Sequence, residues 1–139
     1  MNNDFSTGKT LPAIHPIVDP LLGLPYGHFC LMHSADACWG LIHYVLREGL
    51  GLDLEKDPEV ASQQISEIWG PGDVRDPLSL VQPWDIYILA TKHPWSDHLG
   101  LVVDDLSFVH VRQRTGVVLE PLRRWRPKLF QLARLRILM

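Results

Sequence analysis

The sequence predicts a single α+β domain in which N-terminal helices pack on an antiparallel sheet of about five strands. In the first half, apolar residues at positions 38, 41, 42, 45 and 46 follow the spacing of one helix face. From Trp84 onward the pattern changes to short alternating or β-branched runs separated by turn residues. The 139 residues, 46% of them hydrophobic and 21% charged, suffice for one domain with its own core.

Residues 1–20 contain three prolines and little periodicity, so we expect an irregular lead-in before a domain spanning 21–139. The first residues lack the basic and apolar regions of a secretory signal, and no apolar run approaches the length of a membrane span. We therefore expect synthesis in the cytoplasm without a signal peptide. With only two cysteines, a disulfide framework is not indicated.

The first helix is expected to begin at Cys38. Asp36 is a suitable N-cap, and Gly49-Leu50-Gly51 supplies a stop because glycine readily takes the left-handed conformation. A cysteine in the first turn faces unpaired N–H groups and the positive end of the helix dipole, which stabilise a thiolate. Cys38 is thus a candidate nucleophile; the alternative is a small buried hydrophobic residue.

The remaining elements follow in order along the chain. A second helix is expected to start at Asp57-Pro58-Glu59 and to run through Trp69 to the glycines at 70 and 72, with loops at 21–37 and 73–83. Five strands are then expected in an antiparallel meander, at 84–90, 98–103, 106–111, 116–120 and 129–138.

Two of the seven histidines, His98 and His110, fall in consecutive predicted strands. If a three-residue loop, 103–105, joins these strands, the two histidines lie directly opposite each other on one face of the sheet. A two-residue loop would place them on opposite faces. We favour the first register. With the N-terminus of the first helix docked on that face, the three side chains form a nucleophile, a base and a group that orients the base.

Four ordered blocks resemble NlpC-type cell-wall cysteine peptidases, which are papain-like enzymes, and the chain is most similar to their phage tail-tip branch. The blocks are Ala-Cys-Trp-Gly-Leu-Ile at 37–42, Gln-Pro-Trp-Asp-Ile at 82–86, His-Leu-Gly-Leu-Val-Val at 98–103 and Phe-Val-His at 108–110. The resemblance covers roughly residues 21–120. It implies a papain-like domain and a catalytic triad of Cys38, His98 and His110.

The resemblance also implies roles around the triad. Tyr26 resembles the upstream tyrosine of the family, whose hydroxyl helps to polarise the substrate carbonyl, with the Cys38 N–H as the other oxyanion donor. Two positions depart from the family pattern, because Ala37 and Trp84 stand where an aspartate and a glycine are usual.

Other constellations are weaker. His28, Cys30, His33 and Cys38 could in principle bind zinc, but they lack the usual paired spacings, so we expect neither a metal nor an organic cofactor. Residues 1–105 carry 5 basic and 15 acidic side chains, whereas 106–139 carry 8 and 1. This basic segment could meet an anionic polymer or a protein partner, but a solvated face is the simpler interpretation. No nucleic-acid-binding motif is present.

The expected function is hydrolysis of peptide bonds in peptidoglycan stem peptides through an acyl-enzyme on Cys38. Family members commonly cut between γ-D-glutamate and diaminopimelate. The expected partners are stem peptides and phage tail proteins, and the expected place of action is a virion tail or the cell wall after delivery. Two alternatives remain: a non-catalytic tail-assembly or adaptor protein that keeps the fold, and a secreted antibacterial amidase effector.

Overall fold

A computed structural model of the protein describes residues 11–28, 37–52, 64, 66–71, 81–89 and 98–136. The elements, in chain order, are α1 (His15–Val18), η2 (Asp19–Leu21), α3 (Ala37–Leu50), β1 (Trp69–Pro71), β2 (Ile86–Leu89), β3 (His98–Val102), β4 (Ser107–Arg112), β5 (Gly116–Pro121), α6 (Leu122–Trp125), η3 (Arg126–Lys128) and β6 (Leu129–Leu135). Among these residues, no helix has the length and apolar character needed to cross a membrane.

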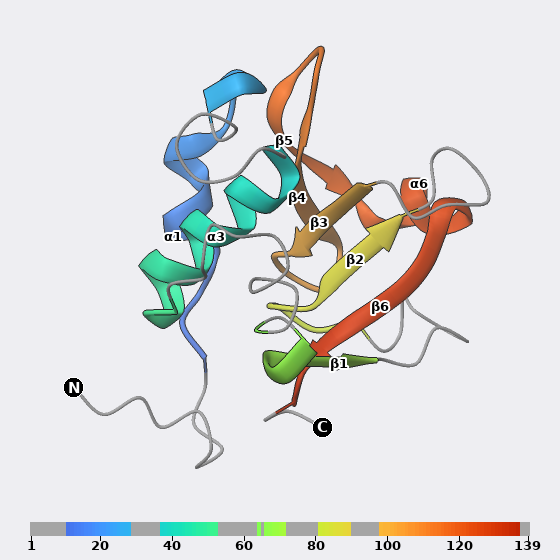
Figure 1. Ribbon diagram of the computed structural model, residues 1–139. Coiled ribbons are helices and arrows are strands. Elements are labelled where there is room, and N and C mark those ends of the chain that lie inside the picture. The colour runs from blue at the N-terminus through green and yellow to red at the C-terminus, as the bar shows by residue number, and fades with distance from the viewer. Residues whose placement is uncertain are drawn as a thin grey trace.

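The strands form one antiparallel sheet in the order β1-β6-β2-β3-β4-β5 (Figure 1). The predicted α+β class is therefore confirmed, with six strands among the described residues rather than about five. The meander prediction holds only for β2 to β5. The last strand, β6, returns across the sheet and pairs with β2, and β1 pairs with the far side of β6.

The assignment of Trp69 to the second helix was wrong. Residues 66–68 are helical, but Trp69 begins strand β1 and pairs with Leu135. Its buried indole N–H donates to the carbonyl oxygen of Trp84 at 3.0 Å. A strand of three residues is too short to show an alternating pattern, so its pairing depends on contacts that are distant in sequence. The predicted start of that helix, at 57–59, lies outside the described residues.

The prediction of an irregular lead-in over residues 1–20 was wrong for residues 15–20, which belong to α1 and η2. Ile14 and Val18 lie on one side of this turn and are buried in the main core. His15 Nε2 lies 2.8 Å from Asp104 Oδ2, which joins α1 to the turn between β3 and β4. The starting residue of the domain, 21, stays a prediction.

Helix α3 confirms the first predicted helix and its stop. Gly51 has a φ of 69°, and its N–H donates to the carbonyl oxygen of Arg47 at 3.1 Å, while the Leu52 N–H donates to that of Leu46 at 3.3 Å. This pair of bonds closes the helix on a left-handed glycine. The predicted cap, Asp36, lies outside the described residues.

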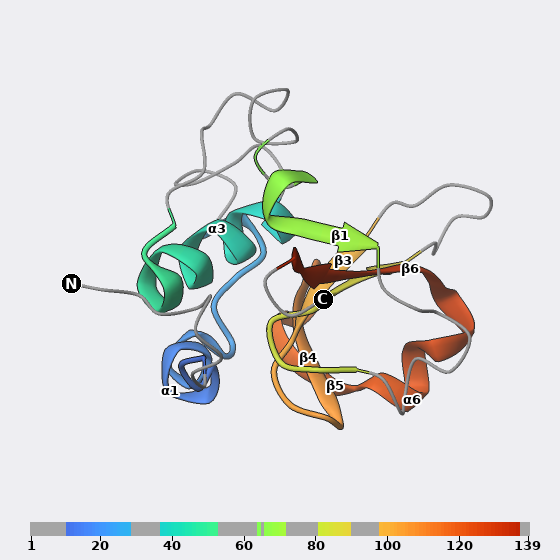
Figure 2. The ribbon, with the colours of Figure 1, turned by 90° about the horizontal axis from the view of Figure 1, so that it is seen from below.

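The two faces of the sheet have different partners. We call the face that packs against α3 the helix face; Leu101, Val109 and Val111 lie on it. The opposite face we call the α6 face, because residues such as Val102 and Phe108 pack there against Leu122 of α6, with Trp125 and Leu129 at the margin. Figure 2 shows the curled sheet with α1 and α3 on one side and α6 on the other.

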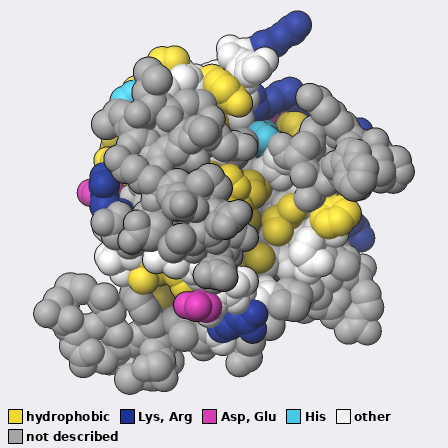
Figure 3. All heavy atoms as spheres, viewed as in Figure 1, with side chains coloured by type: hydrophobic (Ala, Val, Ile, Leu, Met, Phe, Trp, Pro, Cys, Tyr) yellow, Lys and Arg dark blue, Asp and Glu magenta, His cyan; other side chains and the backbone are white. Residues whose placement is uncertain are grey.

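The basic C-terminal segment is mostly a solvated face, as predicted. Its arginines and lysine at 112, 114, 123, 124, 126, 128 and 136 are exposed, and on the face drawn in Figure 3 the basic side chains are spread out rather than gathered in one patch. Arg134 differs, because its Nε and Nη2 atoms donate to the buried carboxylate of Asp85 at 3.0 and 2.8 Å. The Gln82 N–H donates to the same carboxylate, so this buried charge is paired on two sides.

Trp84 occupies the position where the resembled family usually has glycine, and the backbone explains that preference. Its φ is 77°, in the left-handed region that costs a residue with a side chain about 1–2 kcal/mol. The indole is fully buried, and its N–H donates to the carbonyl oxygen of Pro12 at 3.0 Å. A Cβ atom on Gly49 would come within 2.5 Å of the indole, so Gly49 of α3 leaves the space that Trp84 fills.

Replacing Trp84 with glycine should lower the free energy of unfolding by about 1–4 kcal/mol. Loss of a buried tryptophan costs about 3–5 kcal/mol, and relief of the backbone conformation returns about 1–2 kcal/mol. Urea unfolding would measure the difference, with Leu106→Ala, at a side chain that is 73% exposed, as the control. A Trp84→Gly protein as stable as the wild type would contradict this explanation.

Candidate active site

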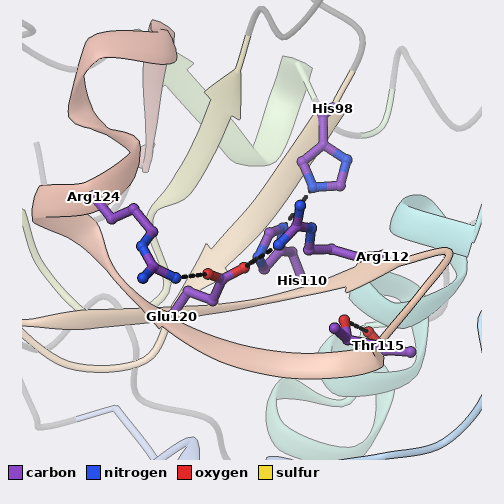
Figure 4. Close-up of polar contacts among 7 residues, drawn as sticks. His98, His110, Arg112, Thr115, Glu120 and Arg124 are labelled. Atoms are coloured by element: carbon purple, nitrogen blue, oxygen red, sulfur yellow. Dashed lines mark hydrogen bonds and ion pairs between the residues drawn. The ribbon is translucent and has the colours of Figure 1, made fainter.

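His98 and His110 meet on the α6 face, although their register differs from the predicted one. Leu101 pairs with Val109 and Val102 with Phe108, which shifts the register by two residues from the predicted pairing. The predicted direct opposition of the two histidines was therefore wrong. An even shift preserves the face, however, and His98 Nε2 lies 2.6 Å from His110 Nδ1 (Figure 4).

Asp104 explains the longer turn between β3 and β4. Its Oδ1 atom accepts hydrogen bonds from the backbone N–H groups of Leu106 and Ser107 at 2.9 and 2.8 Å, and from the Ser107 hydroxyl at 2.9 Å. An aspartate that binds N–H groups two and three residues ahead stabilises a turn of its own. Val102 pairs with Phe108, so five residues, 103–107, lie between the paired positions instead of the predicted three, 103–105.

His110 is completely buried in an aromatic environment. Its ring centroid lies 4.6 Å from that of Phe108 and 5.0 Å from that of Trp125. Its Nε2 atom is 2.8 Å from Oε1 of Glu120. Burial lowers the pKa of His110 from 6.5 to about 4, even though the hydrogen bond with Glu120 acts in the opposite direction. His110 is therefore neutral near pH 7.

Glu120 is the member of this cluster that sequence reasoning missed. It is 6% exposed on β5, and Oε2 accepts a hydrogen bond from Arg124 at 3.0 Å, while Arg112 lies 3.4 Å from Oε1. Burial raises its pKa, but the hydrogen bonds from His110 and Arg124 outweigh burial, so its pKa lies below the ordinary value. One signal was available: Glu120 is the single acidic residue among positions 106–139.

Gly100 provides the space that the Phe108 ring occupies on the α6 face. A Cβ atom there would lie 2.4 Å from the Phe108 ring and 2.8 Å from the backbone oxygen of Val109. Any larger residue would push Phe108 away from the position in which its ring packs beside His110. The glycine in the block at 98–103 thus provides the space for the Phe108 ring, which packs beside His110.

Cys38 is the second residue of α3, in its first turn as predicted. Its side chain lies outside the described part of the structure. Helix α3 packs against β3 and β4 on the helix face, whereas both histidines lie on the α6 face. The expectation that the helix docks on the histidine face was therefore wrong. Successive side chains of a strand point to opposite faces, so Leu101 and Val109 lie on the face opposite the histidines. They provide the apolar surface against which α3 packs.

Tyr26 follows a segment that is attached to the edge of β5. The Gly23 N–H donates to the carbonyl oxygen of Val117 at 2.9 Å, and the Val117 N–H donates to that of Leu24 at the same distance. Tyr26 is half-buried and packs against the main core. Its role beside the nucleophile stays a prediction. Of the four weak zinc candidates, only His28 has a described side chain, and Cys30 and His33 lie outside the described residues.

Two solved structures share this fold. One, a protein similar to a lipoprotein of the NLP/P60 family from Staphylococcus aureus, has a TM-score of 0.58 and 15% identity over 97% of this chain and 42% of that chain. The other, an NlpC/P60 family protein from Bacillus cereus, has a TM-score of 0.61 and 18% identity over 91% of this chain and 41% of that chain. No family model and no curated protein matches the sequence.

The likeness to these structures confirms the predicted NlpC-type resemblance at the level of the fold. This chain spans less than half the length of either protein, so the activity of the whole proteins does not transfer with the fold. The narrower assignment to a phage tail-tip branch stays a prediction.

Acidification should destabilise the protein through His110. Because its pKa is lower in the folded protein, about 4 instead of 6.5, the unfolded chain binds the proton more readily, so stability present above pH 6.5 is lost as pH falls toward 4. Glu120, whose pKa is also lowered, acts in the same direction. The expected loss from His110 is on the order of 3 kcal/mol.

Urea unfolding at pH 7.5 and at pH 5 would measure the part of this loss that falls between these pH values, about 2 kcal/mol, in the wild type and in His110→Gln, which does not titrate in this range. The variant should show a much flatter dependence on pH. Equal losses in both proteins would show that other groups cause the acid sensitivity.

Proposed function

We propose that this protein is a cysteine peptidase that hydrolyses peptide bonds in peptidoglycan stem peptides through an acyl-enzyme on Cys38. The observation that carries the proposal is the 2.6 Å contact between His98 Nε2 and His110 Nδ1, in a sheet against which the helix bearing Cys38 packs. A thiol at a helix N-terminus and an oriented imidazole are the two components that activate a sulfur nucleophile. The fold of the NlpC/P60 proteins and the sequence blocks that resemble them support the same chemistry.

In the proposed reaction, Nδ1 of His98 takes the proton of the Cys38 thiol while His110 holds Nε2. The thiolate attacks the carbonyl carbon of the scissile bond and forms a tetrahedral intermediate. Collapse of this intermediate breaks the C–N bond and gives a thioester, and the leaving amine takes the proton from His98. Water then attacks the thioester with His98 as the base, which releases the carboxylate product and regenerates the thiol.

The position of His98 fits this reaction despite the opposite faces of α3 and the histidine pair. His98 is the first residue of β3, so its ring lies at one end of the strand, and it is only half-buried. Because the sheet separates its two faces, a group on the first turn of α3 can reach the α6 face only around the end of a strand. We propose that the Cys38 sulfur meets His98 there, with the Cys38 N–H and the Tyr26 hydroxyl as oxyanion donors.

The substrate is proposed from the sequence resemblance rather than from the site geometry. The resemblance indicates the bond between γ-D-glutamate and diaminopimelate, and delivery by a phage tail to the cell wall. The proposed chemistry needs no metal or organic cofactor, because thiol, imidazole and backbone N–H groups supply each step.

Digestion of purified peptidoglycan tests the proposal. The wild type should release stem-peptide fragments detectable by mass spectrometry, and Cys38→Ser and His98→Ala should lower the rate on the order of 10³-fold or more, because members of a catalytic triad act as a unit. Cys30→Ser, which keeps the nucleophile, serves as the matched cysteine control and should retain activity. Absence of fragments with the wild type would favour the adaptor alternative.

A further inference from the structure

We propose that Glu120 is a positioning residue whose carboxylate fixes the tautomer of His110 and thereby directs the hydrogen bonds of the histidine pair toward a base at Nδ1 of His98. The role in catalysis rests on the proposed function. The proton arrangement itself does not, because it follows from contacts among three neighbouring strands: His98 on β3, His110 on β4 and Glu120 on β5 (Figure 4).

The direction of each hydrogen bond follows from the carboxylate. An ionised carboxylate can only accept, so Nε2 of His110 must carry the proton in its 2.8 Å contact with Glu120. A neutral imidazole has one N–H, so Nδ1 of His110 is an acceptor, and Nε2 of His98 must donate across the 2.6 Å contact. A neutral His98 that donates from Nε2 carries no proton at Nδ1, so Nδ1 has the lone pair that a base needs.

Two conditions make this chain of bonds directional. His110 must be neutral, and its burial among Phe108 and Trp125 lowers its pKa to about 4. Glu120 must be ionised, and the hydrogen bonds from His110 and Arg124 lower its pKa despite burial. Without the carboxylate, His110 could equally donate from Nδ1 to His98. Nδ1 of His98 would then hold the proton and could not act as a base.

A purely structural role for Glu120 makes a different prediction. In that case its partner would be Arg124, and the ion pair would attach α6 to β5. The Arg124 side chain is 69% exposed, whereas those of His110 and Glu120 are 0% and 7% exposed. An exposed ion pair contributes little, so the buried bond to His110 is the stronger of the two contacts.

Nitrogen NMR of histidine-labelled protein tests the assignment directly. The Cys38→Ser background is suitable, because no thiolate can then bias the imidazoles. At pH 7, His110 should be protonated at Nε2 and not at Nδ1. Glu120→Leu should change this to a mixture of tautomers or to Nδ1–H, whereas Arg124→Gln, which removes only the ion pair, should leave it unchanged. Protonation of His110 at Nδ1 in the Cys38→Ser parent would overturn the proposal.

Glu120→Gln provides a second variant if Glu120→Leu does not fold. The amide oxygen can still accept from His110, but the amide nitrogen can donate instead, so both tautomers should be detected. A Glu120→Gln spectrum identical to that of the parent would show that the negative charge is not what fixes the tautomer, and would overturn the proposal.

Kinetics on the otherwise wild-type enzyme separate this inference from the proposed function. Glu120→Leu should lower kcat about 10- to 100-fold with little change in KM. This loss is smaller than the roughly 10⁴-fold loss caused by changing the residue directly bonded to a catalytic histidine. Arg123→Gln, an exposed change on α6, should retain full activity.

If the wild type cleaves and a folded Glu120→Leu protein cleaves equally well, the role of Glu120 fails while the peptidase proposal stands. If the wild type does not cleave, only the NMR result decides on Glu120.

Discussion

The hydrogen bond between His110 and Glu120 joins the neighbouring strands β4 and β5, and both side chains are buried. Either side chain without a hydrogen-bond partner would cost a large free energy. A buried carboxylate requires donors, and a buried imidazole requires a partner for its N–H group. Each satisfies the other at 2.8 Å, and Arg124 and Arg112 approach the carboxylate from the exposed side. The cluster is therefore polar in composition but well paired, which is the condition under which a buried polar group makes a structure more rigid.

The surrounding residues restrict where the imidazoles can lie. Phe108 and Trp125 pack against the His110 ring, and Gly100 gives Phe108 the space to do so. The Arg112 guanidinium lies 5.2 Å from the Trp125 ring centroid, which adds a cation–π contact at the margin. His98 is the least enclosed member, at the start of β3. The buried, neutral histidine is thus His110, and the more accessible one is His98. This arrangement suits a site in which the outer imidazole exchanges protons with a substrate.

Local sequence patterns predicted the parts of the fold that depend on neighbouring residues. The periodicity of 38–46 and the glycines at 49 and 51 predicted α3 and its end, and turn residues separated five of the six described strands, all except β1. The histidine pair was predicted on one face, although the turn was two residues longer than expected, because Asp104 binds N–H groups ahead of it. A register error of two residues leaves each side chain on the same face, so the predicted pairing of the two histidines on one face still holds.

The features that were missed depend on contacts between distant residues. The pairing of β6 with both β1 and β2 joins residues 40 to 66 positions apart, and no local pattern shows it. Glu120 was missed because its partner on β4 is identified only once the register of β5 is known. Trp84 has a backbone conformation that favours glycine, so local sequence rules do not predict a tryptophan there. The space beside Gly49, which the indole fills, explains it.

If the histidine pair serves the thiol of Cys38, the reactivity of that thiol depends on His98. The rate of Cys38 alkylation by a thiol-reactive probe should be followed as a function of pH in the wild type and in His98→Ala. The wild-type thiol should react well below the pH of about 8.5 at which a free thiol ionises, and His98→Ala should shift reactivity up toward that value. Identical profiles for the two proteins, both resembling that of a free thiol, would contradict this dependence.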